Sequence, residues 1–82
     1  MEHQPISYDA EADTLYVRFS TEEVCRTTAL GDLRLVDYDV RNEVVGIEFI
    51  DVSSGIALRD LPFAAKIEES IGVNRDQFKI VA

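Results

Sequence analysis

The stretch that most constrains the fold is residues 35–51, LVDYDVRNEVVGIEFID. Two runs rich in β-branched and aromatic residues flank a polar turn, Val-Arg-Asn-Glu, and this pattern is typical of antiparallel strands joined by a tight turn. We expect Asn42 to have positive φ, because asparagine tolerates the left-handed region better than other non-glycine residues. The stretch therefore predicts adjacent strands at Leu33–Asp39 and Glu43–Ile50.

Three further strand-like segments precede this pair. The clearest is Thr14–Ser20, where apolar residues strictly alternate with tyrosine and arginine, as in a strand with one buried face. Pro5–Asp9 is expected at a sheet edge, because its proline cannot donate to a ladder, and Glu23–Leu30 is a weaker candidate. Five short strands with tight turns and no intervening helix predict an antiparallel meander over residues 6–54.

The pattern changes after the linker Ser53–Gly55. Apolar residues then recur at every fourth position, which makes one apolar stripe on a helix: Phe63, Ile67 and Ile71. Gly72 stands where a C-terminal cap belongs. We expect an amphipathic helix at Leu61–Ile71, packed on one face of the sheet, and a helix start near Ile56 is also compatible with the residues.

The last segment, Gln77–Ala82, alternates like a strand. Two roles remain open for it: a sixth strand on the same sheet, or a strand that crosses to a second subunit. The expected fold is thus one small α+β domain over residues 1–82. It has an antiparallel meander of about five strands in residues 6–54, then one helix and a tail in residues 55–82.

The small size of the chain and its few cysteines and histidines limit how it can be stabilised. A single core in an 82-residue chain supplies only about 3–5 kcal/mol of net stability. One cysteine, Cys25, and one histidine, His3, exclude an internal disulfide and a Cys/His zinc site. We therefore expect burial to be gained by self-association, as a homodimer or a hetero-complex. With no export signal and no apolar run that spans a bilayer, the chain is expected in the cytoplasm, away from membranes.

The net charge of −8 is unevenly distributed. Residues 1–51 contain 12 acids and 4 bases, whereas residues 52–82 contain 4 of each. Such an acidic sheet region repels phosphate backbones, so nucleic acid is not an expected partner. Basic proteins and cations are the partners that this charge favours.

No catalytic signature is present. Asp9, Glu11 and Asp13 have the spacing that opens a calcium loop, but Thr14 replaces its glycine and Ser20 its bidentate glutamate, so an acidic turn is expected. There is no phosphate-binding glycine loop and no nucleophile with a matching base. We therefore expect no enzyme activity, no cofactor and no metal.

Asp37 poses a problem of register. If Leu33 and Leu35 face the core, a period of two places Asp37 there as well, where an unpaired carboxylate is costly. Three solutions remain open. A bulge could move Val36 and Tyr38 to the inner face; Asp37 could pair with Arg18, Arg26 or Arg34; or the site could be open for a ligand or partner.

Gly46 interrupts the strand Glu43–Ile50, since glycine weakens a strand interior. Close packing beneath the helix, or a bulge, would explain it. A groove that admits another backbone is the functional alternative.

The pattern ISYDAEADTLYVRFS, followed by LVDYDVRNEVVGIEFIDVSS, resembles the bacterial "domain of unknown function 2283" family. The resemblance covers residues 6–54. It rests on two sets of positions: Ile6, Tyr8, Asp9, Glu11, Asp13, Leu15 and Tyr16, and then Val36–Asp39, Val44–Glu48 and Ser53. Asn42 replaces the turn glycine of the family pattern. Members of this family are often encoded beside small toxin-like proteins, which implies an antitoxin-like role for some of them.

The sequence favours a protein-binding module that captures a basic partner, in the manner of an antitoxin. We expect Asp37, Asp39 and Glu48 to contribute to the binding surface. The alternatives are binding of a small ligand or metal cation in a carboxylate-lined groove, and a purely structural homodimer.

Overall fold

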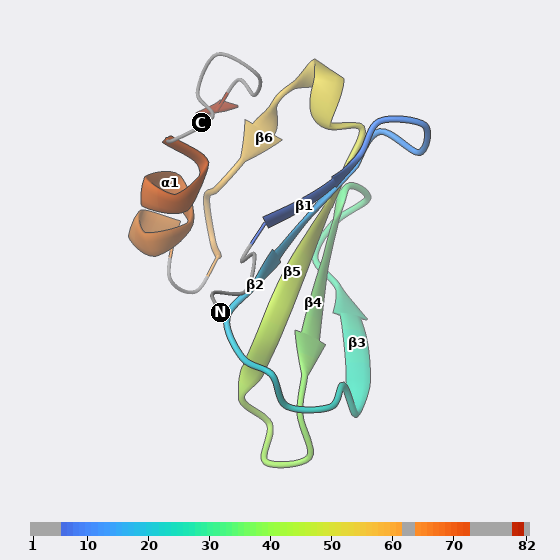
Figure 1. Ribbon diagram of the computed structural model, residues 1–82, viewed down its shortest axis with the longest axis vertical. Helices are drawn as coiled ribbons and strands as arrows, with labels where there is room; N and C mark the ends of the chain where they lie inside the picture. The colour runs from blue at the N-terminus through green and yellow to red at the C-terminus, as the bar shows by residue number, and fades with distance from the viewer. Residues whose placement is uncertain (1–5, 62–63, 73–79, 82) are drawn as a thin grey trace.

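The computed structural model describes residues 6–61, 64–72 and 80–81. Five strands form one antiparallel sheet in the order β1-β2-β5-β4-β3 (Figure 1). The strands are β1 (Ile6–Asp9), β2 (Thr14–Arg18), β3 (Arg26–Ala29), β4 (Arg34–Tyr38) and β5 (Val44–Ile50). A 3-10 turn η1 (Val52–Ser54), strand β6 (Ile56–Ala57), helix α1 (Ala64–Gly72) and strand β7 (Ile80–Val81) follow.

The predicted class, an antiparallel five-strand sheet with one C-terminal helix, is confirmed. The strand order differs from a simple meander at one place, because β5 lies between β2 and β4 and leaves β3 at the edge. Burial explains this order. The seven residues of β5 are all buried or half-buried, whereas all four residues of β3 are exposed. A strand with apolar side chains in most positions suits the sheet centre, and a polar strand suits an edge.

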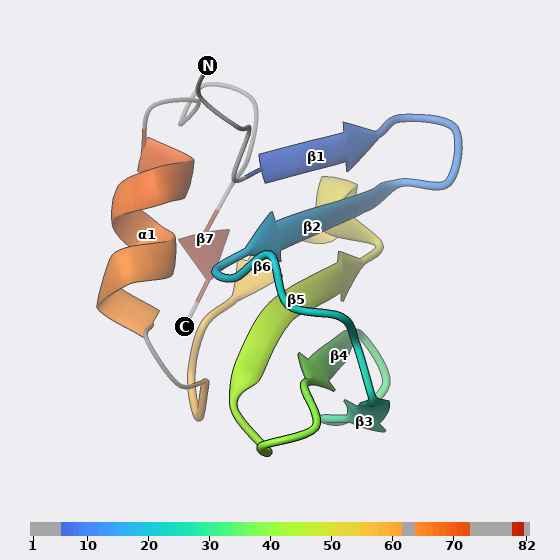
Figure 2. The same cartoon turned by 60° about the horizontal axis from the view of Figure 1, so that its bottom comes forward.

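The inner face of the sheet carries the core. Side chains from β2, β4 and β5 form one buried cluster with residues that follow β5: Leu15, Val17, Val36, Ile47, Phe49, Val52, Ile56, Leu58, Leu61 and Ile67. Figure 2 shows α1 and β6 together on one side of the sheet. Ile67, at the middle of α1, has no exposed surface. The predicted packing of an amphipathic helix on one sheet face is therefore confirmed.

Two expectations about the C-terminal part need correction. A helix start near Ile56 is wrong, because Ile56–Ala57 is strand β6 and the described helix begins at Ala64. A sixth strand on the main sheet is also wrong: Ile80–Val81 pairs with β6 in a separate parallel pair. Residues 77–79 and 82 of the predicted last strand lie outside the described residues. None of the described helical segments is long and apolar enough to cross a membrane.

Candidate functional site

The structure separates the three carboxylates that the sequence singles out. Asp37 on β4 and Glu48 on β5 lie on the outer face of the sheet, the face opposite the core. Each follows a core residue of its strand, Val36 or Ile47, and successive side chains point to opposite faces. Asp39 lies in the turn between β4 and β5 and is only 4% exposed. The first two therefore share a surface, and the third belongs to a turn.

The premise that Leu33 and Leu35 face the core is wrong. Val36 is buried in the core, and Leu33 is 47% exposed. Asp37 is therefore on the outer face, where its carboxylate does not enter the core. The structure does contain a bulge between β4 and β5, since Tyr38 pairs with Val44 and leaves Val45 as the extra residue.

Asp37 accepts two hydrogen bonds from neighbouring strands. The Tyr16 hydroxyl donates to Oδ2 at 2.8 Å, and the Thr27 hydroxyl donates to Oδ1 at 2.6 Å. The arginine pairing considered for this carboxylate is wrong, since the ion pairs of the described residues both involve Arg41 instead. Two hydroxyl donors satisfy Asp37 without neutralising it, so its charge stays on the outer face.

Gly46 is the position that lets Tyr16 reach Asp37. Tyr16 is on β2, Asp37 is on β4, and β5 lies between them. A Cβ atom at position 46 would lie 2.8 Å from Cε2 of Tyr16, and closer still to its Cζ and hydroxyl oxygen. The phenol ring therefore lies directly over the glycine and crosses β5. Close packing beneath the helix is therefore wrong, because Gly46 packs against Tyr16 on the outer face. The alternative of a bulge is confirmed at the adjacent Val45.

The surroundings of Tyr16 hold its hydroxyl in the neutral form. Partial burial, the hydrogen bond to Asp37 and the negative charges of Asp37 and Glu48 raise the pKa of Tyr16 from 10.0 to about 12. Arg18 opposes this shift, with its guanidinium carbon 5.8 Å from the centre of the Tyr16 ring. The tyrosine thus acts as a hydrogen-bond donor at neutral pH, not as a base.

This raised pKa predicts how the protein responds to alkali. The absorbance of tyrosinate, taken as the difference between wild type and Tyr16→Phe, should titrate near pH 12. Asp37→Asn should lower that midpoint but leave it above 10.0, because burial persists. Since the unfolded chain ionises first, the stability that Tyr16 contributes is complete below pH 10.0 and is lost as the pH rises to about 12. A Tyr16 midpoint that Asp37→Asn leaves unchanged would contradict this account.

Asp39 organises the turn between β4 and β5. Its Oδ1 accepts the main-chain N–H groups of Arg41 and Glu43, each at 2.9 Å. These two hydrogen bonds hold the pKa of Asp39 below its ordinary value, and the bond from the Glu43 N–H has the larger effect. The Arg41 guanidinium lowers the pKa further, whereas burial raises it. Asn42 has φ 69°, which confirms the positive φ expected there.

The acidic segment after β1 is a turn, as expected. Oδ1 of Asp9 accepts the N–H groups of Glu11 and Ala12, each at 3.1 Å. Asp13 accepts the Ser53 hydroxyl at 2.7 Å, so this turn is tied to η1 and Ser53 is more than a linker residue. Within the described ranges, no group of three or more His, Cys, Asp or Glu residues is placed to hold a metal ion.

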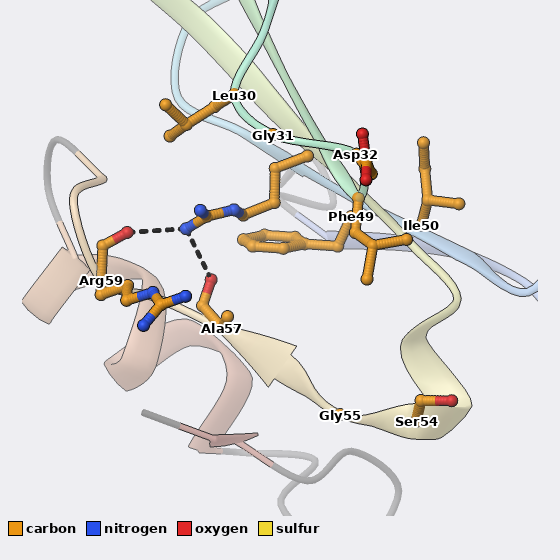
Figure 3. Close-up of a pocket in the computed structure, with 11 residues that line it drawn as sticks. Leu30, Gly31, Asp32, Phe49, Ile50, Ser54, Gly55, Ala57 and Arg59 are labelled. Atoms are coloured by element: carbon orange, nitrogen blue, oxygen red, sulfur yellow. Dashed lines mark hydrogen bonds between the residues drawn. The ribbon is translucent and has the colours of Figure 1, made fainter.

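Two surface hollows lie away from the contact of Tyr16 with Asp37. Figure 3 shows the first, about 340 Å³, between the β3–β4 turn and the segment that follows η1. There the Arg34 guanidinium donates to the carbonyl oxygens of Arg59 at 2.6 Å and Ala57 at 3.3 Å. This hollow has two arginines and one carboxylate, Asp32, so it does not match a carboxylate-lined groove.

The second hollow, about 350 Å³, is formed by the segment before β3 and the turn after β4. It is lined by Glu22, Glu23, Val24, Cys25, Asp39 and Val40. Three of these residues are acidic, but the Asp39 carboxylate is already held by the turn amides. This hollow is the place in the described structure where the alternative of a carboxylate-lined groove would apply.

The sequence predicted Asp37 and Glu48 as surface residues of the site, but it did not predict that Tyr16 and Thr27 contact Asp37 or that Tyr16 lies beside Glu48. A signal for Tyr16 was present, because the alternation in β2 places it opposite the buried Leu15 and Val17. The signal for its contact was Gly46, an isolated glycine in a strand, which marks a close approach. The sequence does not indicate that Tyr16 and Gly46 contact each other, because the two residues are 30 positions apart.

The fold and this surface define a small β-sheet protein with one face covered by α1 and the segment before it, and an outer face that carries Tyr16, Asp37 and Glu48. A family model described as "Protein of unknown function (DUF2283)" matches residues 6–53. The chain therefore belongs to this family, as the resemblance suggested. No curated protein and no solved structure matches the chain.

Several positions of the family pattern touch each other in this fold. Tyr16, Asp37 and Gly46 form the outer-face contact, and Asp13 binds Ser53. These five positions of the pattern are thus accounted for by contacts within the chain.

Proposed function

We propose that the protein is a cytoplasmic binding module that captures a basic protein partner on the outer face of its sheet, in an antitoxin-like manner and without catalysis. The observation that supports this is the asymmetry of the sheet. The inner face packs against α1 and the segment before it, whereas the outer face presents Glu48 beside Tyr16 and Asp37 at the Tyr16 hydroxyl.

The outer face offers a cationic side chain both charge and an aromatic surface. Glu48 is half-buried and lies beside Tyr16 in the register of β2 and β5. A lysine or arginine of the partner would pair with Glu48 and lie against the ring, as Arg18 already does from within the chain. The net charge of −8 would also accelerate the encounter with a basic protein.

The test is a charge reversal with a matched control. Glu48→Lys should weaken capture of a basic partner from host lysate by roughly tenfold or more, and raising the salt should weaken the wild-type complex too. Glu68→Lys, on the exposed side of α1, changes the net charge by the same amount and should bind as wild type does. The partner is identified by mass spectrometry, and its affinity is then measured with both proteins purified.

Two results would refute the proposal: recovery of no basic partner, or an equal effect of both reversals. Glu48 is preferred to Asp37 for this test, because replacing Asp37 also removes the acceptor for Tyr16 and Thr27. Asp39 is omitted from the proposed surface, because it is buried in its turn.

A further inference from the structure

The free edge of β3 is the described part of the sheet that is best suited to pair with another strand. All four residues of β3 are exposed, and β4 pairs with one side of it only. Natural edge strands are often blunted by proline, lysine, a bulge or a covering segment. Strand β3, Arg-Thr-Thr-Ala, has no proline and no lysine, and its four residues pair with β4 in a regular register; the irregularity lies before them, where the Cys25 N–H donates to the Tyr38 carbonyl at 2.7 Å.

The register identifies the main-chain groups at this edge. The Leu30 N–H donates to the Arg34 carbonyl at 2.8 Å, so this pair is hydrogen-bonded. Hydrogen-bonded and non-bonded pairs alternate in an antiparallel ladder. Thr28 therefore bonds to Val36, whereas Thr27 and Ala29 direct their N–H and C=O groups away from β4.

We infer that β3 pairs antiparallel with β3 of a second copy of this chain. A two-fold axis at Thr28 places Thr27 of each copy opposite Ala29 of the other. The outward groups of these two residues then form four main-chain hydrogen bonds, and Thr28 faces its own equivalent. The inference is independent of the capture of a basic partner, since it concerns the edge and not the outer face.

Exposed apolar side chains favour a second copy as the occupant of this edge. Val24 and Val40, 38% and 83% exposed, line one hollow at the start of β3, and Leu33, 47% exposed, follows its end. Antiparallel self-pairing brings the start of one β3 beside the end of the other. It therefore places Val24 of each copy near the β3–β4 turn of the other, which contains Leu33, and it does so twice by symmetry.

The residues that pair at this edge carry no negative charge, whereas acids flank the strand: Glu22 and Glu23 before its start and Asp32 after its end. With a net charge of −8, two copies repel each other over most orientations. Strand β3 contains one arginine, Arg26, and no acid. The pairing would join the two sheets into one and place the Glu48 side chains of both copies on a continuous outer face.

The first test measures mass and blocks the edge. Sedimentation equilibrium of the full chain should give twice the chain mass of 9.2 kDa. Ala29→Pro should leave the monomer folded, because proline is tolerated where the N–H points outward, and should weaken the dimer by about a hundredfold. Thr28→Pro is the contrasting variant and should damage the fold itself, because it removes a β3–β4 bond.

The second test does not depend on those variants. In a Cys25→Ser background, Thr28→Cys should form a disulfide-linked dimer rapidly under mild oxidation, because directly opposed residues meet the distance that a disulfide requires. Thr27→Cys, equally exposed but offset from its equivalent, should cross-link at least about tenfold more slowly. A monomeric wild type, an Ala29→Pro protein that dimerises as well as wild type, or equal cross-linking at both positions would each overturn the inference.

Discussion

Replacing Ile67 by alanine is expected to abolish most of the folded population. Ile67 is fully buried in the cluster that joins α1 to the inner face of the sheet. An Ile→Ala change at such a site costs about 2–5 kcal/mol, from lost burial and from the cavity left behind. A single core of this size supplies only about 3–5 kcal/mol in total. The variant should therefore lose its cooperative urea transition, or retain only a small part of it, when followed by circular dichroism.

Lys66→Ala is the matched control for Ile67→Ala. Lys66 is adjacent on the same helix and is exposed, so its replacement should change the free energy of unfolding by no more than about 0.5 kcal/mol. If Ile67→Ala were as stable as Lys66→Ala, the helix would not be docked on the sheet. The fold would then depend on the β-strands alone.

The second large effect is expected at Gly46. Gly46→Ala introduces a Cβ into the space of the Tyr16 ring, which lies 2.8 Å away at Cε2 and closer at Cζ. The ring has to move off β5, and its hydrogen bond to Asp37 is then lost. Overpacking of this kind costs about 1–3 kcal/mol, so the urea midpoint should fall clearly although only one methyl group is added.

A double-mutant cycle separates this steric effect from a strand effect. In a Tyr16→Ala background the space above position 46 is open, and alanine is a better strand residue than glycine. Gly46→Ala should there be neutral or stabilising by about 0.5–1 kcal/mol. The sign of the substitution therefore depends on Tyr16, which is the signature of a direct contact. Equal destabilisation in both backgrounds would show that Gly46 is required for its backbone conformation and not for the ring.

Asp37 illustrates how far sequence reasoning carries for this protein. Strict alternation correctly indicated that Asp37 shares a face with Leu33 and Leu35, but it could not say which face is inside. Val36 faces the core, because β4 pairs with β5 in a register that places Val36 opposite Ile47, and Ile47 and Phe49 of β5 face the core. The supposed buried carboxylate was therefore never buried. Its partners were hydroxyl groups from two other strands, and the arginines that electrostatics alone suggested play no part.

The amino-acid sequence by itself determined the local features of this protein. These include the five strand segments, the positive φ at Asn42, the acidic turn after β1 and one C-terminal helix, which was expected at Leu61–Ile71 and is described at Ala64–Gly72. All of them depend on residues close together in the chain, where side-chain period and turn chemistry act directly.

Only the tertiary structure decided the strand order, the direction in which each face points, and the contact of Tyr16 with Gly46 and Asp37. These depend on which segment buries the most apolar surface once all segments compete for the same core. That competition placed β5 at the centre of the sheet and β3 at its edge. The outer face with its carboxylates supports the first proposal and the free edge of β3 supports the second, and both are consequences of that arrangement.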